Sequence, residues 1–103
     1  MARTSRDWEE GLARDVRDPE FARRFILAAV EDGIPLQQAI GKVIRLAGVK
    51  EFAAKVRLDQ SQVSRAIHPR HSPNQDILNR LLRPFRLKLS LVFLDKQKRR
   101  HVA

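Results

Sequence analysis

The chain has 103 residues and no cysteine; 32% of its residues are charged, and its formal net charge is +9. This length suits one domain with a modest core, and the lack of cysteine excludes a disulfide framework and a thiolate nucleophile. The longest apolar run, residues 25–30, is too short to span a bilayer, and the charged N-terminal sequence lacks the apolar stretch of a signal peptide. We therefore expect a soluble cytoplasmic protein.

The positive charge is concentrated in the second half of the chain. Residues 1–50 contain nine Lys and Arg against eight Asp and Glu, whereas residues 51–103 contain twelve against four, a net charge of +8. Such a surplus suits a surface that binds phosphates, because affinity for nucleic acid comes largely from counterion release. The alternative is that these side chains only keep a small protein soluble.

The N-terminal residues 1–17 are expected to form an arm that contains a short helix. Within it, residues 7–16 give a weak helix signal, because apolar residues recur at the spacing i, i+4 and i+8. These residues are Trp8, Leu12 and Val16.

Two further helices are predicted before the middle of the chain. Asp18 and Pro19 are a strong start signal, because Asp is a good N-cap and Pro suits the first helical position. This helix is expected to end at residues 31–33. Pro35 opens the next predicted helix, and Gly48 is a plausible stop for it.

Residues 51–67, EFAAKVRLDQSQVSRAI, predict two short helices joined by a tight turn. Asp59 is a suitable N-cap for the second helix, and apolar residues recur at helical spacing on its inner face. This is the layout of a helix-turn-helix whose recognition helix begins near Gln60. An ordinary helical hairpin with a solvated polar face is the alternative, since the bare pattern gives many false positives.

The polar residues of the second helix suit base recognition. The Gln amide matches N6 and N7 of adenine, the Arg guanidinium matches O6 and N7 of guanine, and Ser can bond to either base. Other basic side chains in this region are expected to hold the phosphate backbone. The predicted DNA-binding residues are Gln60, Ser61, Gln62, Ser64, Arg65, Lys50 and Arg70.

Catalytic and metal-binding patterns are hard to find in this sequence. His68 and His71 lie in a proline-rich turn, but two histidines without a further ligand nearby are weak evidence for a metal site. The chain contains no HExxH, GxSxG, Walker loop or paired-carboxylate arrangement. We expect no enzyme activity, no cofactor and no metal.

The C-terminal part changes from helical to strand periodicity. A helix is predicted from Asn74 or Gln75 to Pro84, where the ring cannot continue the helical hydrogen bonds. Residues 87–94 alternate as a strand does, and residues 95–103 form a basic tail. A lone strand leaves backbone groups unpaired, so we predict that it pairs with its copy in a symmetric dimer. Addition of the strand to the sheet of a partner protein is the alternative. The predicted dimer interface contains Leu87, Leu89, Leu91, Val92 and Phe93.

The order of these elements resembles the HigA-like addiction module antidote family, within the broader Cro/repressor helix-turn-helix class. The resemblance covers about residues 15 to 94 and is carried by DPEFARRFILAAVEDG, IPLQQAIGKVIRLAG, EFAAKVRLDQSQVSRAI and SPNQDILNRLLRPFRLKLSLVFL. Three positions depart from the family pattern. Arg57 and Arg86 stand where Gly is usual, and Ser72 replaces the Asn of an NP turn.

The resemblance implies a mainly α, five- to six-helix lambda-repressor-like domain over residues 18–94, with one C-terminal β-strand. It implies an antitoxin of a type II toxin–antitoxin system, which neutralises a RelE/HigB-like toxin and represses its own operator. Gln60 and Ser61 match the base-contacting pair common in phage-type repressors. A free-standing helix-turn-helix transcriptional repressor and a protein-interaction module without DNA binding are the alternatives.

Overall fold

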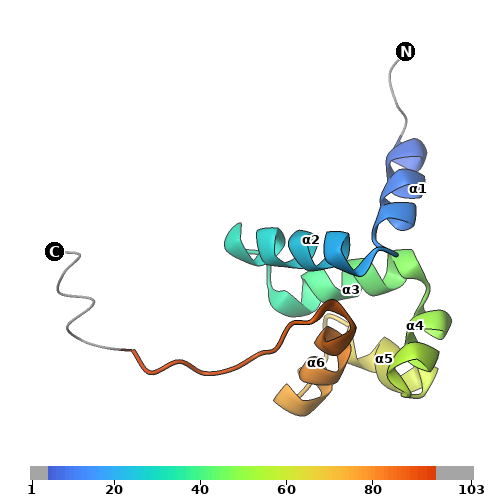
Figure 1. The fold of residues 1–103 in the computed structure, drawn as a ribbon. Coiled ribbons are helices and arrows are strands. Elements are labelled where there is room, and N and C mark those ends of the chain that lie inside the picture. The colour runs from blue at the N-terminus through green and yellow to red at the C-terminus, as the bar shows by residue number, and fades with distance from the viewer. Residues whose placement is uncertain (1–4, 95–103) are drawn as a thin grey trace, which may run out of the picture.

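The computed structural model describes residues 5–94, and this part of the chain is mainly helical, as predicted (Figure 1). None of the helices described there is both long and apolar enough to cross a membrane. The predicted basic tail, residues 95–103, lies outside the described residues. The helices are α1 (Ser5–Asp15), α2 (Pro19–Glu31), α3 (Leu36–Ala47), α4 (Val49–Val56), α5 (Gln60–Ala66), α6 (Gln75–Leu82) and the 3-10 helix η1 (Arg83–Phe85).

The start and end of α2 follow the predicted signals. Asp18 is the N-cap, and its carboxylate accepts a hydrogen bond from the backbone N–H of Glu20 at 3.1 Å. Pro19 occupies the first helical position, where a missing N–H costs nothing. At the other end Gly33 has φ of +91°, a left-handed conformation that glycine adopts without a steric penalty.

The first helix is only partly packed against the rest of the molecule. Val16, just after α1, is buried, and Leu12 is partly buried against the core, but Trp8 is 63% exposed. Figure 1 shows why, since α1 stands away from the body and only its C-terminal end approaches α3. The predicted apolar stripe therefore enters the core at one end only.

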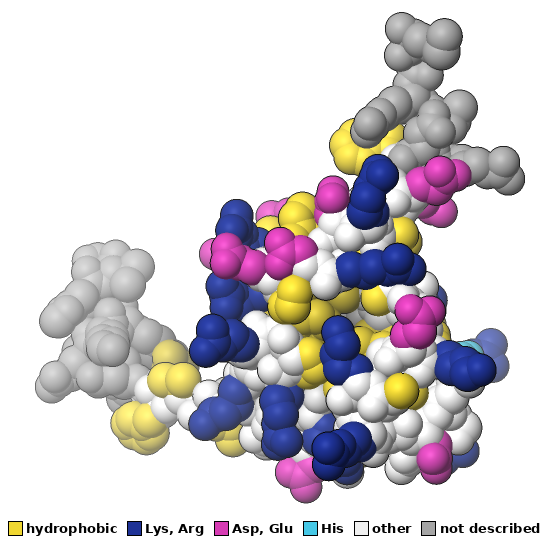
Figure 2. Space-filling model, turned by 45° about the vertical axis from the view of Figure 1, so that its right-hand side comes forward, with side chains coloured by type: hydrophobic (Ala, Val, Ile, Leu, Met, Phe, Trp, Pro, Cys, Tyr) yellow, Lys and Arg dark blue, Asp and Glu magenta, His cyan; other side chains and the backbone are white. Residues whose placement is uncertain are grey.

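Residues 87–94 form no strand within the described chain. After η1 the chain turns at Arg86, which has φ of +58°. Two side chains of α6 then hold the backbone of Leu89. Its N–H donates to Asn79 Oδ1 at 2.6 Å, and its carbonyl accepts from Gln75 Nε2 at 3.2 Å. Beyond Ser90 the chain extends away from the body, and hydrophobic side chains of this segment project at the left of Figure 2. A strand requires a second strand beside it, so the predicted strand is unconfirmed in the single chain.

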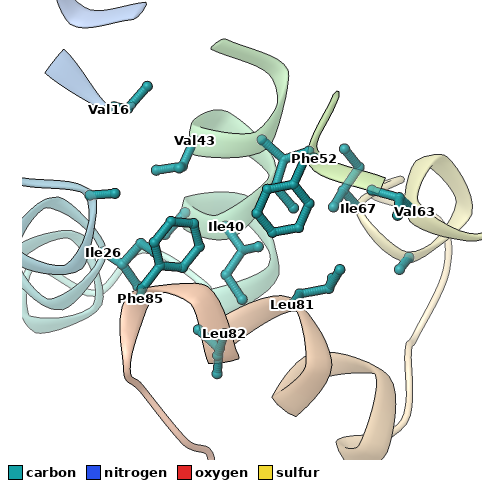
Figure 3. Packing of buried hydrophobic residues seen from close by; sticks show 14 of the residues in the cluster. Val16, Ile26, Ile40, Val43, Phe52, Val63, Ile67, Leu81, Leu82 and Phe85 are labelled. Carbon is teal, nitrogen blue, oxygen red and sulfur yellow. The ribbon is translucent and has the colours of Figure 1, made fainter. Parts of the chain in front are cut away.

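The core is built around α3, which contacts α1, α2, α4 and α6. Its Ile40, Val43 and Ile44 side chains are completely buried, and Figure 3 shows Ile40 and Val43 among the other core side chains. Each such side chain contributes roughly 1.5–3 kcal/mol to stability by its removal from water. Phe52 of α4 and Phe85 of η1 stack with ring centroids 5.9 Å apart, which ties the C-terminal part of the chain to α4.

The connection between α3 and α4 consists of Gly48 alone. Its N–H donates to the Ile44 carbonyl at 2.8 Å, and its own carbonyl accepts from the Phe52 N–H at 2.9 Å, so one residue ends α3 and starts α4. It has φ of +107°, and a Cβ there would come within 3.0 Å of a Glu51 carboxylate oxygen. Glycine therefore permits the direct turn that positions α4 and α5.

Candidate nucleic-acid interface

A tight turn joins α4 to α5, and Arg57 adopts the left-handed conformation at its centre, with φ of 59° and ψ of 44°. The Leu58 N–H donates to the Ala53 carbonyl at 3.0 Å, and the Arg57 N–H donates to the Ala54 carbonyl at 3.3 Å. These two bonds are the Schellman pattern that usually ends with glycine. Leu58 packs against the core. The turn therefore forms with an arginine at a position whose left-handed conformation is unfavourable for residues other than glycine.

The first turn of α5 is held by a capping box between Asp59 and Gln62. The Asp59 backbone N–H donates to Gln62 Oε1 at 3.1 Å. A bidentate pair with adenine requires both this oxygen and the amide nitrogen to face the base. The Gln62 oxygen instead accepts a hydrogen bond from the Asp59 backbone. Gln62 was predicted to read DNA, and the geometry gives it a capping role that the sequence interpretation missed.

The remaining polar residues of α5 project outward, as the helical spacing predicted. Val63, Ala66 and Ile67 are buried on the opposite face. The inner face anchors the helix, and the outer face is open to a ligand. The exposed side chains on it are Gln60, Ser61, Ser64 and Arg65.

Two polar side chains of α3 hold the C-terminal end of α5 and the loop that follows it. Gln37 Nε2 lies 2.7 Å from the Ala66 carbonyl oxygen and 2.7 Å from that of His68. Arg45 donates to the Ile67 carbonyl at 2.9 Å. These contacts satisfy carbonyls that a helix end leaves without partners, and they make the position of α5 dependent on α3.

Sequence reasoning did not assign a role to Gln37 or Arg45. With Gly41 they occupy positions i, i+4 and i+8, a stripe on one side of α3. A Cβ at Gly41 would lie 3.4 Å from the Ile67 Cβ, an ordinary contact distance, and 3.1 Å from an Arg45 nitrogen, so a larger residue there would press mainly on the Arg45 side chain. The sequence signal that could have indicated this role is the Gln–Gly–Arg stripe, which lies beside the apolar stripe of the same helix.

The loop between α5 and α6 borders an open groove of about 290 Å³ beside α5. Arg65 of α5 and His71 of the loop both line this groove. His68 and His71 meet edge to face with ring centroids 5.5 Å apart. Within the described residues, no group of three or more His, Cys, Asp or Glu side chains is placed to hold a metal.

Two further residues that were predicted to bind DNA lie before and after α5 in the sequence. Lys50 is exposed in the first turn of α4, and Arg70 is exposed in the α5–α6 loop. Several Lys and Arg side chains gather on the lower half of the face seen in Figure 2. Among the described side chains, Arg24 and Glu20 form the single ion pair, so the other cations have no carboxylate partner there.

The structure divides the predicted dimer residues into two groups. Leu87 and Leu89 are half-buried and pack against the core of their own chain. Leu91, Val92 and Phe93 are 96%, 86% and 92% exposed. The second group alone offers free apolar surface.

No protein-family model matches the chain, and searches among curated proteins and solved structures find no match either. The case for a function therefore depends on the residues described above.

Proposed function

We propose that this protein binds duplex DNA in a sequence-specific manner through α5 and acts as the antitoxin of a type II toxin–antitoxin system. One observation carries the DNA-binding half: α5 exposes Gln60, Ser61, Ser64 and Arg65 on one face while its other face is buried. In this proposal α4 and α5 are the helix-turn-helix of a lambda-repressor-like domain, and α5 is the recognition helix.

The side-chain chemistry supports this assignment. Gln60 and Ser61 stand at the N-terminal end of α5, the end that enters the major groove first in this class. Neither side chain makes a hydrogen bond within the described part of the chain, so both are available to bases. Arg65 lies further along and suits guanine. The surplus of basic residues in the second half supplies the phosphate affinity.

A dimer fits the same function. Two recognition helices about 34–36 Å apart can enter successive major grooves on one side of the duplex. In our proposal the exposed residues Leu91–Leu94 pair antiparallel with the same segment of a second copy, and the predicted strand forms only there. Leu87 and Leu89 then remain on the core of their own chain.

The antitoxin half depends on the resemblance to HigA-like proteins. We propose a RelE/HigB-like toxin as the partner, and the cytoplasm as the place where both act. The N-terminal half is close to neutral in charge and contributes α1 and α2, which base reading by α5 does not require. A free-standing repressor with the same DNA chemistry is the alternative.

A salt series tests the DNA-binding proposal. Fluorescence anisotropy should give a binding constant for duplex DNA that falls steeply with salt, because each phosphate contact contributes a log–log slope of about 0.9. A selection from random duplexes should then return one preferred site. A flat log–log plot, or selection without enrichment, would contradict the proposal.

Co-expression tests the antitoxin proposal. We expect a small RelE/HigB-like toxin encoded next to this gene to stop growth alone and to become harmless when this protein is present. The toxin should be recovered intact in a complex with it. If growth stays arrested although both proteins accumulate, the antitoxin proposal fails and the free-standing repressor remains.

A further inference from the structure

A second basic surface lies beside the α4–α5 turn, outside the predicted reading face. It is an open groove of about 630 Å³. The α4–α5 turn region forms one wall, and α6 with η1 forms the other. The residues that line it are Lys55, Val56, Arg57, Arg80, Arg83 and Pro84.

All four basic side chains of this groove are exposed, and none has a carboxylate partner within the described residues. The Arg80 guanidinium lies 3.5 Å from the backbone carbonyl oxygen of Arg57, so α6 reaches the α4–α5 turn, and all four cations line the same groove. Like charges gathered in this way repel one another and destabilise the folded chain. A bound anion removes this repulsion, so the groove is suited to an anionic ligand.

The position of the groove favours one anion. Arg57 lies two residues before Asp59, the N-cap of α5, so one edge of the groove adjoins the start of the proposed recognition helix. When that helix occupies a major groove, phosphates border it on both sides. The Arg guanidinium suits phosphate oxygens through its planar pair of donors, and Lys55 adds a point charge.

We infer that this groove holds the phosphodiester backbone of the DNA strand that borders the major groove entered by α5. The inference rests on the proposed DNA-binding function and adds a defined phosphate site to it. Lys55, Arg57, Arg80 and Arg83 hold the backbone without reading sequence, and they fix the register in which Gln60 meets a base.

The test compares two double variants of the full chain by anisotropy across a salt series. Lys55→Gln with Arg83→Gln removes two charges from the groove, and neither side chain makes a hydrogen bond or ion pair in the described chain. Arg14→Gln with Lys42→Gln removes one exposed arginine and one exposed lysine from α1 and α3, neither of which makes a hydrogen bond or ion pair in the described chain, and serves as the matched control. Circular dichroism and thermal melting establish that both variants fold.

The groove variant should reduce the log–log salt slope by about 1.8, which corresponds to two lost phosphate contacts. Its affinity should fall by the same factor on the preferred duplex and on random DNA, and Arg83→Gln alone should lower the slope by about 0.9. The control should leave the slope near that of the unmodified protein. Equal slopes for the two double variants would overturn the inference while leaving DNA binding intact. If the unmodified protein binds no duplex at all, the inference and the proposed function both fail.

Discussion

The amide nitrogen of Gln37 lies 2.7 Å from the carbonyl oxygen of His68, which is 31 residues later in the chain. The same nitrogen lies 2.9 Å from the carbonyl oxygen of His71. The same nitrogen also lies near the Ala66 carbonyl at the end of α5, so its two N–H groups are shared among three carbonyl oxygens. The contacts from α3 therefore fix the C-terminal end of α5, and with it the direction of the exposed face of that helix.

Replacement of Gln37 by Ala should lower the free energy of unfolding by about 1–3 kcal/mol, since the two N–H donors that serve these carbonyls are lost together. Urea denaturation measures this change. Gln38→Ala is the matched control, because Gln38 is the exposed neighbour on the same helix and makes no hydrogen bond in the described chain. Similar losses for both variants would show that the Gln37 contacts contribute nothing specific.

Gln60 and Gln62 should respond differently to replacement by Ala. Gln60→Ala should weaken binding to the preferred duplex by roughly 1–3 kcal/mol and leave random DNA almost unaffected. Gln62→Ala should instead lower the free energy of unfolding by roughly 0.5–2 kcal/mol, because it removes half of the capping box. Anisotropy on both duplexes, together with urea denaturation, separates the two roles. A Gln60 variant that loses the same affinity on both duplexes would not be a base reader.

Glycine should have opposite effects at two neighbouring positions. Arg57 has positive φ, a conformation that costs a non-glycine residue about 1–2 kcal/mol, so Arg57→Gly should raise the free energy of unfolding by roughly 0.5–1 kcal/mol after the entropic cost of glycine. Lys55→Gly, inside α4, should lower it by up to about 1 kcal/mol. Chemical denaturation gives both values. Destabilisation by Arg57→Gly would mean that the arginine side chain itself holds the turn.

The exposed C-terminal segment should control the oligomeric state. Leu91→Asp with Phe93→Asp places charges on surface that is solvent-exposed in the single chain, so a dimer should dissociate while thermal melting of the helical core changes little. Light scattering at tens of micromolar gives the mass, and Ser90→Asp serves as the control. A protein that is already monomeric, or a double variant that stays dimeric, would exclude this segment as the main dimer contact.

The local signals in the sequence determined most of the helices. Asp18 with Pro19 started α2, and Gly48 ended α3, because capping depends on residues only a few positions apart. The inner face of α5 followed from helical spacing, which is equally local. Arg57 and Arg86, at positions where the resembled family has Gly, both adopt positive φ. Backbone geometry at a turn is also a local property, and it needs no knowledge of packing.

Only the tertiary structure decided which of these elements work together. Gln37 reaches carbonyls 29 to 34 residues away, and the basic groove combines α4 with α6. The tertiary structure also distinguishes Leu89 from Leu91, although both occupy the same phase of one alternating pattern. The Leu89 backbone is hydrogen-bonded to α6, whereas Leu91 is exposed. The physical reason is that periodicity assigns a residue to a face of its own element. The partner of that face, or its lack of one, depends on how distant elements pack.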